Sequence, residues 1–173
     1  MNFSKVNSQN KKFYIFRHAE TYFSKFDISY GEQTESAEIL PEGISAIKKM
    51  AEFLAKIKTD ANFSSPYRRC RQTVEIVKEI SKKEFLFDDR LRDWYKGKEE
   101  VEIMISRIKD FFEELKSKNF KTIAICTHGY PINTLIALAT KGDVKTSDLQ
   151  DYPKPGILVE IVDRKVKYLD FDK

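Results

Sequence analysis

The sequence predicts a three-layer α/β/α sandwich with a mostly parallel central sheet. Stretches typical of strands alternate with stretches typical of helices along most of the 173 residues, and this alternation favours a parallel sheet with helices on both faces. The length suits a single domain. We assign residues 12–173 to this domain and expect a flexible N-terminal tail over the polar residues 1–11.

A strand and two helices are expected in the first half of the chain. Residues 13–16, Phe-Tyr-Ile-Phe, form a short apolar run that is typical of a strand covered on both faces. Apolar residues then recur at steps of three and four over residues 44–57, which traces one face of a helix. A brief stretch over residues 61–65 and a break at Pro66 follow, and helical spacing resumes over residues 74–80.

The second half continues the alternation. Residues 84–87 are typical of a strand, and a third helix follows over residues 101–115, where the apolar positions are again three or four apart. Residues 122–126, Thr-Ile-Ala-Ile-Cys, are the clearest buried strand, because they are uncharged and contain β-branched side chains. An apolar helix begins near Pro131. The last two expected strands flank a tight polar turn and cover residues 157–162 and 166–169.

Composition excludes several classes of protein. The chain has 31 Lys and Arg against 27 Asp and Glu, and this net charge of +4 is too small and too evenly spread to indicate a nucleic-acid partner, although it suits an anionic small molecule. Cys70 and Cys126 provide neither a disulfide framework nor a metal-binding Cys-x-x-Cys pattern. No apolar run suits a signal peptide or a membrane helix, so we expect a cytoplasmic protein without a membrane partner. The oligomeric state stays open.

The two histidines of the chain both follow predicted strands. His18 comes just after the first strand, and His128 comes just after the strand over residues 122–126. Reactive residues of open α/β sheets lie past the carboxyl ends of strands, so the two imidazoles converge if these strands are parallel neighbours. Arg17 and Arg69 add permanent positive charge, and a guanidinium fork matches a tetrahedral oxyanion. Without a metal-binding spacing, this set favours phosphate over a metal ion.

Five motifs, in a fixed order, carry a resemblance to a known family. Residues 17–21, Arg-His-Ala-Glu-Thr, resemble Arg-His-Gly-Glu-Thr, and residues 40–43 resemble Leu-Thr-x-x-Gly. Residues 64–73 are similar to Ser-Ser-Pro-Leu-x-Arg-Ala-x-Gln-Thr, and residues 91–97 are similar to Leu-x-Glu-x-x-x-Gly. Residues 127–129, Thr-His-Gly, resemble Ser-His-Gly. The chain thus resembles the short, phosphatase-type members of the histidine phosphatase superfamily, which has the phosphoglycerate mutase-like fold.

The resemblance implies a role for each site residue. His18 would be the nucleophile that takes the phosphoryl group and becomes a phosphohistidine. Arg17, Arg69 and His128 would bind the non-bridging oxygens and stabilise the charge of the transition state. Asp93 would protonate the leaving oxygen and then activate water. The implied activity is that of a phosphoric monoester hydrolase that needs no metal and no cofactor.

Departures from the motifs leave the proton donor open. Asp93 stands where the family usually has Glu, and its carboxyl reaches about one methylene less far. Three other carboxylates therefore remain candidate donors, namely Glu20, Asp89 and Glu99. Ser24 stands where a phosphate-contacting Asn is common, which puts that contact in question.

Two other functions also remain open. One is a phosphotransferase of the phosphoglycerate mutase type, and the other is a non-catalytic, phosphate-binding adaptor. The interval between His18 and Arg69 and the stretch after Gly97 are short, which leaves little chain for a lid that would keep water from the intermediate and so favours hydrolysis. Retention of both histidines and both arginines argues against the adaptor.

The substrate is expected to contact two long polar stretches, over residues 22–39 and 141–155, because long loops are often functional. The first stretch supplies four aromatic and four acidic residues, namely Tyr22, Phe23, Phe26 and Tyr30 with Asp27, Glu32, Glu35 and Glu38. Acids near the site disfavour a second anionic group on the substrate. We therefore expect a small phosphomonoester with a neutral body, and a phosphoprotein is the main rival.

Overall fold

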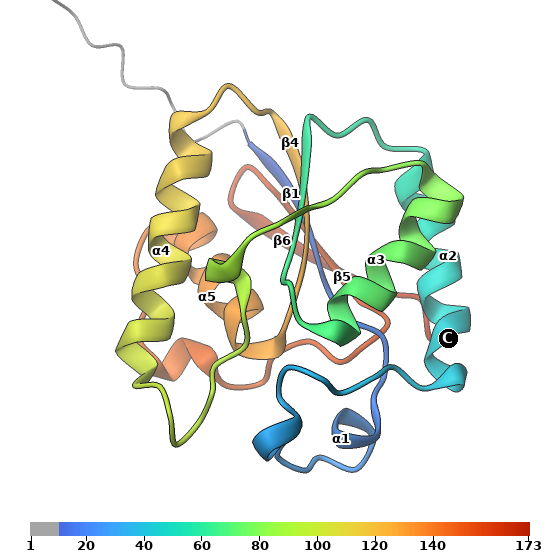
Figure 1. The fold of residues 1–173 in the computed structure, drawn as a ribbon. Coiled ribbons are helices and arrows are strands. Elements are labelled where there is room, and N and C mark those ends of the chain that lie inside the picture. Colours follow the sequence, from blue (N-terminus) through green and yellow to red (C-terminus); the bar gives the residue numbers. More distant parts are fainter. Residues whose placement is uncertain (1–10) are drawn as a thin grey trace, which may run out of the picture.

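The computed structural model describes residues 11–173, and it confirms the predicted fold class (Figure 1). Six strands form one sheet in the order β3-β2-β4-β1-β5-β6. Their bounds are β1 (Lys12–Arg17), β2 (Ala61–Ser64), β3 (Leu86–Phe87), β4 (Thr122–Thr127), β5 (Ile157–Val162) and β6 (Lys165–Asp170). Strands β3, β2, β4 and β1 run parallel to one another. Strand β5 is antiparallel to β1, and β6 is antiparallel to β5.

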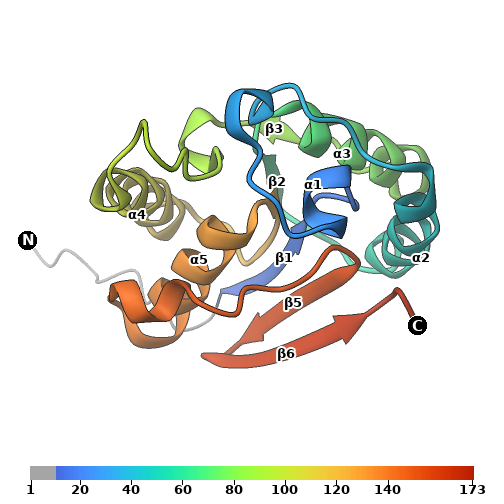
Figure 2. The same cartoon turned by 90° about the horizontal axis from the view of Figure 1, so that it is seen from below.

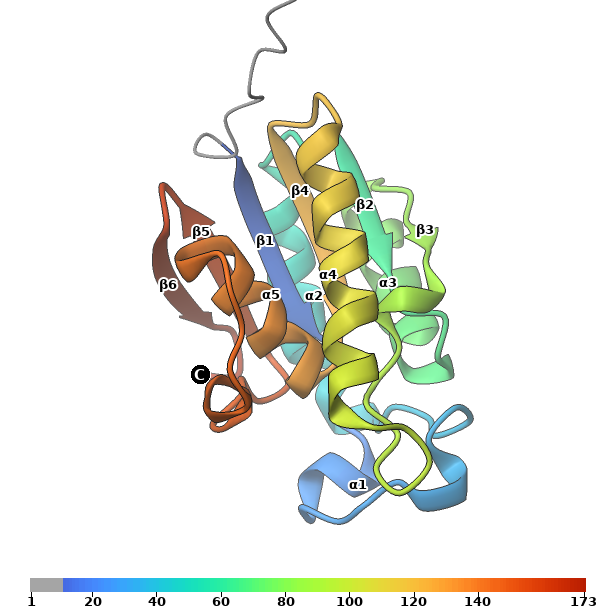
Figure 3. The ribbon, with the colours of Figure 1, turned by 90° about the vertical axis from the view of Figure 1, so that its left-hand side faces the viewer.

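Helices cover both faces of this sheet. Their bounds are α1 (Tyr22–Lys25), α2 (Ile44–Ala55), α3 (Arg68–Ser81), α4 (Val101–Ser117) and α5 (Gly129–Lys141). Figure 2 shows α2 and α3 together on one face and α4 and α5 together on the other, with the β5-β6 pair at one edge. In Figure 3, α4 and α5 lie in front of the sheet. The short helix α1 lies beyond the end of β1, near the carboxyl edge of the parallel strands.

The two core layers follow from the alternation of side chains along β1. Phe13 and Ile15 face the layer of α4 and α5, and Tyr14 and Phe16 face the layer of α2 and α3. Because successive side chains of a strand point to opposite faces, a central strand covered on both sides must be apolar throughout. This requirement explains the uncharged runs from which β1 and β4 were predicted.

Some elements differ from their predicted bounds. The brief stretch over residues 61–65 contains a strand, β2, which the sequence does not announce because Asn62 and the terminal serine interrupt its apolar character. The strand expected over residues 84–87 is reduced to Leu86–Phe87, an exposed pair at the edge of the sheet. Both long polar stretches contain local structure. Residues 22–39 contain α1 and a 3₁₀ turn at Gly31–Gln33, and residues 141–155 contain a 3₁₀ turn at Thr146–Leu149.

The predicted tail over residues 1–11 lies outside the described residues, except for Lys11. Lys11 is 8% exposed, and its ammonium group donates to the carbonyls of Lys118 and Phe120 at 2.7 and 2.5 Å. Lys11 therefore packs against the domain, one residue before the predicted boundary. Within residues 11–173, no helix is both long enough and apolar enough to cross a membrane.

Candidate active site

Two histidines lie at the carboxyl ends of the neighbouring strands β1 and β4. Because these strands are parallel, with Arg17 opposite Thr127, His18 and His128 leave the sheet side by side. The His18 backbone N–H donates to the Thr127 carbonyl at 3.2 Å. The centroids of the two imidazole rings are 5.3 Å apart, and both residues are fully buried. The two imidazoles thus converge, as the order of strands and histidines in the sequence suggested.

One ring nitrogen of His18 is held and the other is free. Nδ1 lies 2.8 Å from the carbonyl oxygen of Ala19, and because a carbonyl only accepts hydrogen bonds, Nδ1 carries the proton. Nε2 is buried and has no hydrogen-bond partner among the described residues. Burial, followed by the charges of Arg69 and Arg17, holds the pKa of His18 well below its usual range. At neutral pH the ring is therefore uncharged, and the lone pair of Nε2 is available as a nucleophile.

The guanidinium groups of Arg17 and Arg69 supply fixed positive charge. Arg69 is fully buried in the first turn of α3, and its guanidinium carbon lies 4.1 Å from the ring centroid of Tyr30. The guanidinium carbon of Arg17 lies 5.1 Å from the ring centroid of Tyr152. Aromatic faces hold both groups without neutralising them. Over residues 11–173 only the Asp93 carboxylate pairs with either arginine, so the site keeps an excess of positive charge that suits an anion.

Asp93 lies between an arginine and a histidine of the site. Its Oδ2 is 3.0 Å from Nη2 of Arg69 and 3.8 Å from Nδ1 of His128. Arg107 of α4 fixes the backbone there by donating to the Asp93 carbonyl at 2.9 Å. Burial raises the pKa of Asp93, against the opposing positive charge nearby. A carboxyl group whose pKa is raised is suited to donating a proton.

The other candidate donors have different surroundings. Burial works to raise the pKa of Glu99, but this pKa is lowered overall. The causes are the hydrogen bonds from Arg107 at 2.8 and 2.9 Å and its charge, together with the Tyr95 backbone N–H and the charge of Arg92. Asp89 lines a separate hollow. Glu20 lines the same cavity as Asp93. Asp93 and Glu20 are therefore the carboxylates that best fit the role of proton donor.

A cavity of about 800 Å³ opens beside these groups. Residues of both long polar stretches line it, together with the segment from Asp93 to Lys96 and the first turn of α5. Of the four acids in residues 22–39, only Asp27 lines this cavity. Other segments supply four more acids to the lining, namely Glu20, Asp93, Asp151 and Asp172. The cavity therefore has acidic side chains, although most of them are not the ones expected from residues 22–39. Three lysines also line the cavity, namely Lys25, Lys96 and Lys154.

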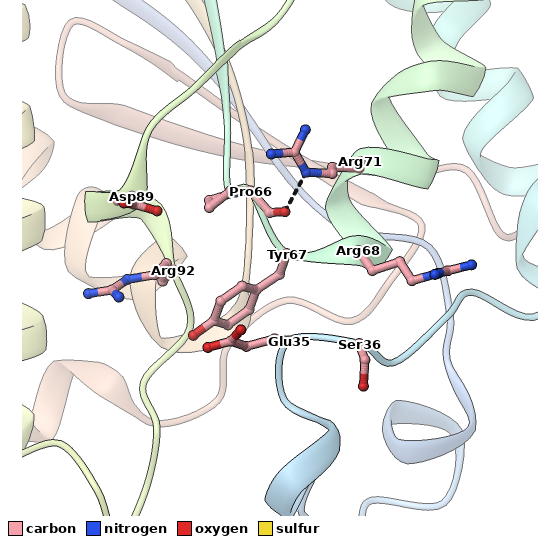
Figure 4. Close-up of a pocket in the computed structure, with 8 residues that line it drawn as sticks. All are labelled: Glu35, Ser36, Pro66, Tyr67, Arg68, Arg71, Asp89 and Arg92. Atoms are coloured by element: carbon pink, nitrogen blue, oxygen red, sulfur yellow. Dashed lines mark hydrogen bonds between the residues drawn. The ribbon is translucent and has the colours of Figure 1, made fainter.

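A smaller hollow of about 530 Å³ adjoins Tyr67 (Figure 4). The centroid of the Tyr67 ring lies 5.4 Å from that of His128, so this side chain forms a wall between the hollow and the site. Arg68 and Arg71 line the hollow and are exposed, as expected of a surface cluster. Nε of Arg71 donates to the Pro66 carbonyl at 2.7 Å, the dashed line in Figure 4.

Two positioning contacts lay beyond the reach of sequence reasoning. The Thr73 hydroxyl accepts from the Ala19 backbone N–H at 2.9 Å and donates to the Arg69 carbonyl at 2.7 Å, which ties the end of β1 to α3. A Cβ atom at Gly129 would lie 2.4 Å from the Tyr152 ring, so only glycine fits there. Thr73 ends the motif over residues 64–73, and Gly129 ends the motif over residues 127–129. These motifs are the only sequence signal that points to either residue.

Both buried histidines are expected to make the protein less stable below neutral pH. For His18 and His128 alike, burial is the main cause that lowers the pKa in the folded state, whereas an unfolded chain has the ordinary pKa of about 6.5. Below that pH the unfolded state binds protons that the folded state does not bind. The free energy of unfolding should then fall by up to about 1.4 kcal/mol per histidine and pH unit.

Urea unfolding at pH 7.5 and at pH 5.5 measures this difference. The double variant H18Q/H128Q is the control, because it keeps every carboxyl group and loses both imidazoles. The wild type should lose stability between the two pH values, and most of that loss should vanish in the double variant. Equal stability of the wild type at the two pH values is the contrary result.

Four of the five predicted site residues lie in a segment that matches a known family. The sequence model described as "Histidine phosphatase superfamily (branch 1)" matches residues 13–102, just over half of the 173-residue chain. The chain belongs to the histidine phosphatase superfamily. This match contains four of the five predicted site residues and ends before His128. The structure of this histidine phosphatase superfamily member supplies the missing neighbour by placing His128 against His18.

The proteins to which this chain is similar include phosphatases and a mutase. "Putative phosphoserine phosphatase 2" of Hydrogenobacter thermophilus is 24% identical, over 75% of this chain and 79% of that protein. Mycobacterial glucosyl-3-phosphoglycerate phosphatase has a TM-score of 0.74 at 16% identity, over 92% of this chain and 96% of that one. Phosphoglycerate mutase from Bacillus anthracis scores 0.70 at 17% identity, over 95% and 96%. The solved structures establish the fold, and the family match with the phosphatase-named relatives supports a phosphoric monoester hydrolase.

Proposed function

We propose that this protein hydrolyses a phosphomonoester through a phosphohistidine intermediate on His18. One observation carries the proposal: Nε2 of His18 is buried and unprotonated, and has no partner in the described part of the chain. The charges of Arg69 and Arg17 act on the same ring. A free nucleophile beside two guanidinium groups is what the transfer of an anionic phosphoryl group requires.

In the first step, Nε2 of His18 attacks phosphorus as the bond from phosphorus to the leaving oxygen breaks. Arg17, Arg69 and His128 stabilise the charge on the three non-bridging oxygens. Protonated Asp93 gives its proton to the leaving oxygen, so that an alcohol departs. The products of this step are the free alcohol, the phosphohistidine and the Asp93 carboxylate.

In the second step, a water molecule attacks the phosphorus of the phosphohistidine. The Asp93 carboxylate takes a proton from this water, and the bond from phosphorus to Nε2 breaks. Inorganic phosphate leaves, and both His18 and Asp93 return to their starting protonation states. Asp93 thus gives up one proton and regains one, and His18 gains the phosphoryl group and then loses it. The net reaction consumes one water per phosphomonoester.

A mutase activity would use the same residues but would need a lid over the phosphohistidine. The short intervals between motifs suggested too little chain for a lid, yet the Bacillus anthracis mutase is covered over 96% of its own length by this chain. Size therefore does not separate the two activities. The cavity does favour hydrolysis, since it is lined by exposed polar side chains such as Lys25, Asp27 and Lys96 and so admits water to the intermediate.

The proposal for the substrate class starts from the lysines of the cavity, which lie among the acids Glu20, Asp27, Asp151 and Asp172. Lys25 is already paired with Glu42 at 2.7 Å. Lys96 has no ion pair within residues 11–173, and its ammonium lies 4.7 Å from the ring centroid of Tyr130. A hydrogen bond to Tyr130 raises the pKa of Lys96 and keeps it charged. We propose a small phosphomonoester whose leaving group carries a carboxylate for Lys96, such as O-phosphoserine, named for the Hydrogenobacter relative.

The wild-type protein is therefore expected to release phosphate from O-phosphoserine in the presence of EDTA, because arginines and histidines supply the charge that a metal would otherwise supply. The variant Lys96→Met should raise KM for O-phosphoserine about tenfold, equivalent to about 1.4 kcal/mol. Its KM for p-nitrophenyl phosphate, which has no carboxylate, should stay the same. Steady-state phosphate release measures both constants.

Lys154→Met is the matched control, since it removes another exposed lysine of the same cavity. An equal rise in KM for both substrates in K96M would remove the case for a carboxylate contact. Activity that EDTA abolishes and a divalent cation restores would overturn the mechanism itself. Faster isomerisation of 3-phosphoglycerate than release of its phosphate, with 2,3-bisphosphoglycerate present, would favour the mutase.

A further inference from the structure

We infer that Ser65 is a positioning residue that holds His128 in the tautomer with its proton on Nδ1, the nitrogen nearest Asp93. The inference rests on the proposed function, in which His128 donates a hydrogen bond to the phosphoryl group. Only a protonated ring nitrogen can make that bond. The question is therefore which of the two nitrogens carries the proton, and what decides it.

The Ser65 hydroxyl has two neighbours, and their chemistry fixes its proton. Ser65 follows β2 directly and is fully buried. Its Oγ accepts a hydrogen bond from the Tyr67 backbone N–H at 3.3 Å and lies 2.7 Å from Nε2 of His128. Since a backbone N–H can only donate, the hydroxyl hydrogen is left for Nε2. Nε2 is then an acceptor, and the proton of the neutral ring is on Nδ1.

The opposite tautomer would leave two groups without a partner. With the proton on Nε2, the Ser65 hydroxyl hydrogen would have no acceptor among its described contacts. Nδ1 of His128 would be a buried lone pair without a donor, and it would face Oδ2 of Asp93 at 3.8 Å. An unpaired buried acceptor costs about 1–3 kcal/mol. That lone pair would also repel the phosphoryl oxygens that His128 is proposed to bind.

Cys70 is the other neighbour of Nε2, and its contacts are compatible with the same tautomer. Its Sγ lies 3.6 Å from Nε2 of His128 and 3.8 Å from the Thr127 carbonyl oxygen. A thiol is a weak donor, so it cannot replace the shorter contact from Ser65. Whether the thiol hydrogen points to the carbonyl or to Nε2, it requires no proton on Nε2.

The chain allows a direct test because it has only two histidines. Nitrogen-15 labelling of histidine and long-range proton–nitrogen spectra at pH 7.5 give two ring systems, which the H18Q variant assigns. The expected spectrum shows Nδ1 of His128 as the protonated nitrogen and Nε2 as the bare one. In Ser65→Ala, the two nitrogens should become more alike, and kcat for p-nitrophenyl phosphate should fall about 10–100-fold, as when the group that orients a ligating histidine is removed.

Ser64→Ala is the matched control. Ser64 is equally buried, but its hydroxyl donates to the Ser65 carbonyl at 3.0 Å and is not a partner of the His128 ring. This variant should keep both the wild-type tautomer and most of the activity. Ser65→Thr keeps a hydroxyl and should retain the tautomer, which separates positioning from a merely structural role.

The possible outcomes separate this inference from the proposed function. A wild-type spectrum with the proton of His128 on Nε2 overturns the inference, even if S65A does not fold. An S65A spectrum identical to that of the wild type overturns it as well. If the wild type has the expected tautomer and S65A loses it, but the wild type releases no phosphate from any ester, the positioning by Ser65 stands and the proposed hydrolysis fails.

Discussion

The His18→Gln variant is expected to lose phosphatase activity by more than about 10⁴-fold in kcat, because the reaction loses its nucleophile. The structure singles out His18 by the bare Nε2, while Nδ1 is tied to the Ala19 carbonyl at 2.8 Å. Glutamine suits this buried position because its amide can still donate to that carbonyl. Steady-state release of p-nitrophenol and of phosphate measures the loss.

Ligand binding is the control for this variant. Arg17 and Arg69 remain in H18Q, so orthovanadate or inorganic phosphate should still bind, and urea unfolding should remain cooperative. Folded protein that binds the anion but does not turn over is the expected combination. Activity within tenfold of the wild type would mean that water attacks the ester directly. A wild-type protein that binds vanadate but hydrolyses no ester would instead favour the adaptor.

The Asp93→Asn variant should lose about 10²–10⁴-fold in kcat with O-phosphoserine, as expected when a general acid is removed. With p-nitrophenyl phosphate the loss should be much smaller, because nitrophenolate leaves without a proton. Asparagine keeps an oxygen that can accept from Arg69, whose Nη2 lies 3.0 Å from Oδ2 of Asp93. The contrast between the two substrates therefore reports proton donation rather than damage to the arginine.

Glu20→Gln is the matched comparison, since Glu20 is the other candidate donor that lines the cavity. It should affect the two substrates equally and weakly. If E20Q shows the leaving-group dependence and D93N does not, the proton donor is Glu20. If neither variant shows it, water supplies the proton and the assignment of a carboxylic acid is wrong.

The sheet was predictable where burial on both faces leaves a strong pattern. β1 and β4 lie in the centre of the sheet and are apolar between their end residues, so they could be found from residues 13–16 and 122–126. β2 pairs with β4 but is only four residues long and contains Asn62. Its place is set by backbone pairing, which its side chains do not signal.

The site was predictable as a set of residue types and not as a set of contacts. The ends of two strands and the motifs brought forward Arg17, His18, Arg69, Asp93 and His128, which the structure gathers in one place. Their catalytic roles remain predictions. The contacts that hold them come from distant segments, because the Arg69 guanidinium is held by the carbonyl of Thr34 and the ring of Tyr30.

The direction of loop side chains was the least predictable feature. Glu32, Glu35 and Asp27 belong to one polar stretch, yet only Asp27 lines the larger cavity, while Glu35 lines the smaller hollow. Composition gives the charge of a loop and not the side to which each charge turns. From that composition the sequence predicts a neutral leaving group, whereas Lys96 is the basis for proposing one that carries a carboxylate, and the K96M comparison decides between the two.

Trapping of the intermediate tests the central claim most directly. The wild-type enzyme is mixed with a radiolabelled phosphomonoester and quenched in alkaline detergent at the shortest accessible times, and the labelled peptide is identified. We expect a protein-bound label that is stable in base, is lost in acid and lies on His18, and no label in the H18Q variant. A label on another residue, or turnover with no labelled protein at any quench time, would contradict the phosphohistidine mechanism.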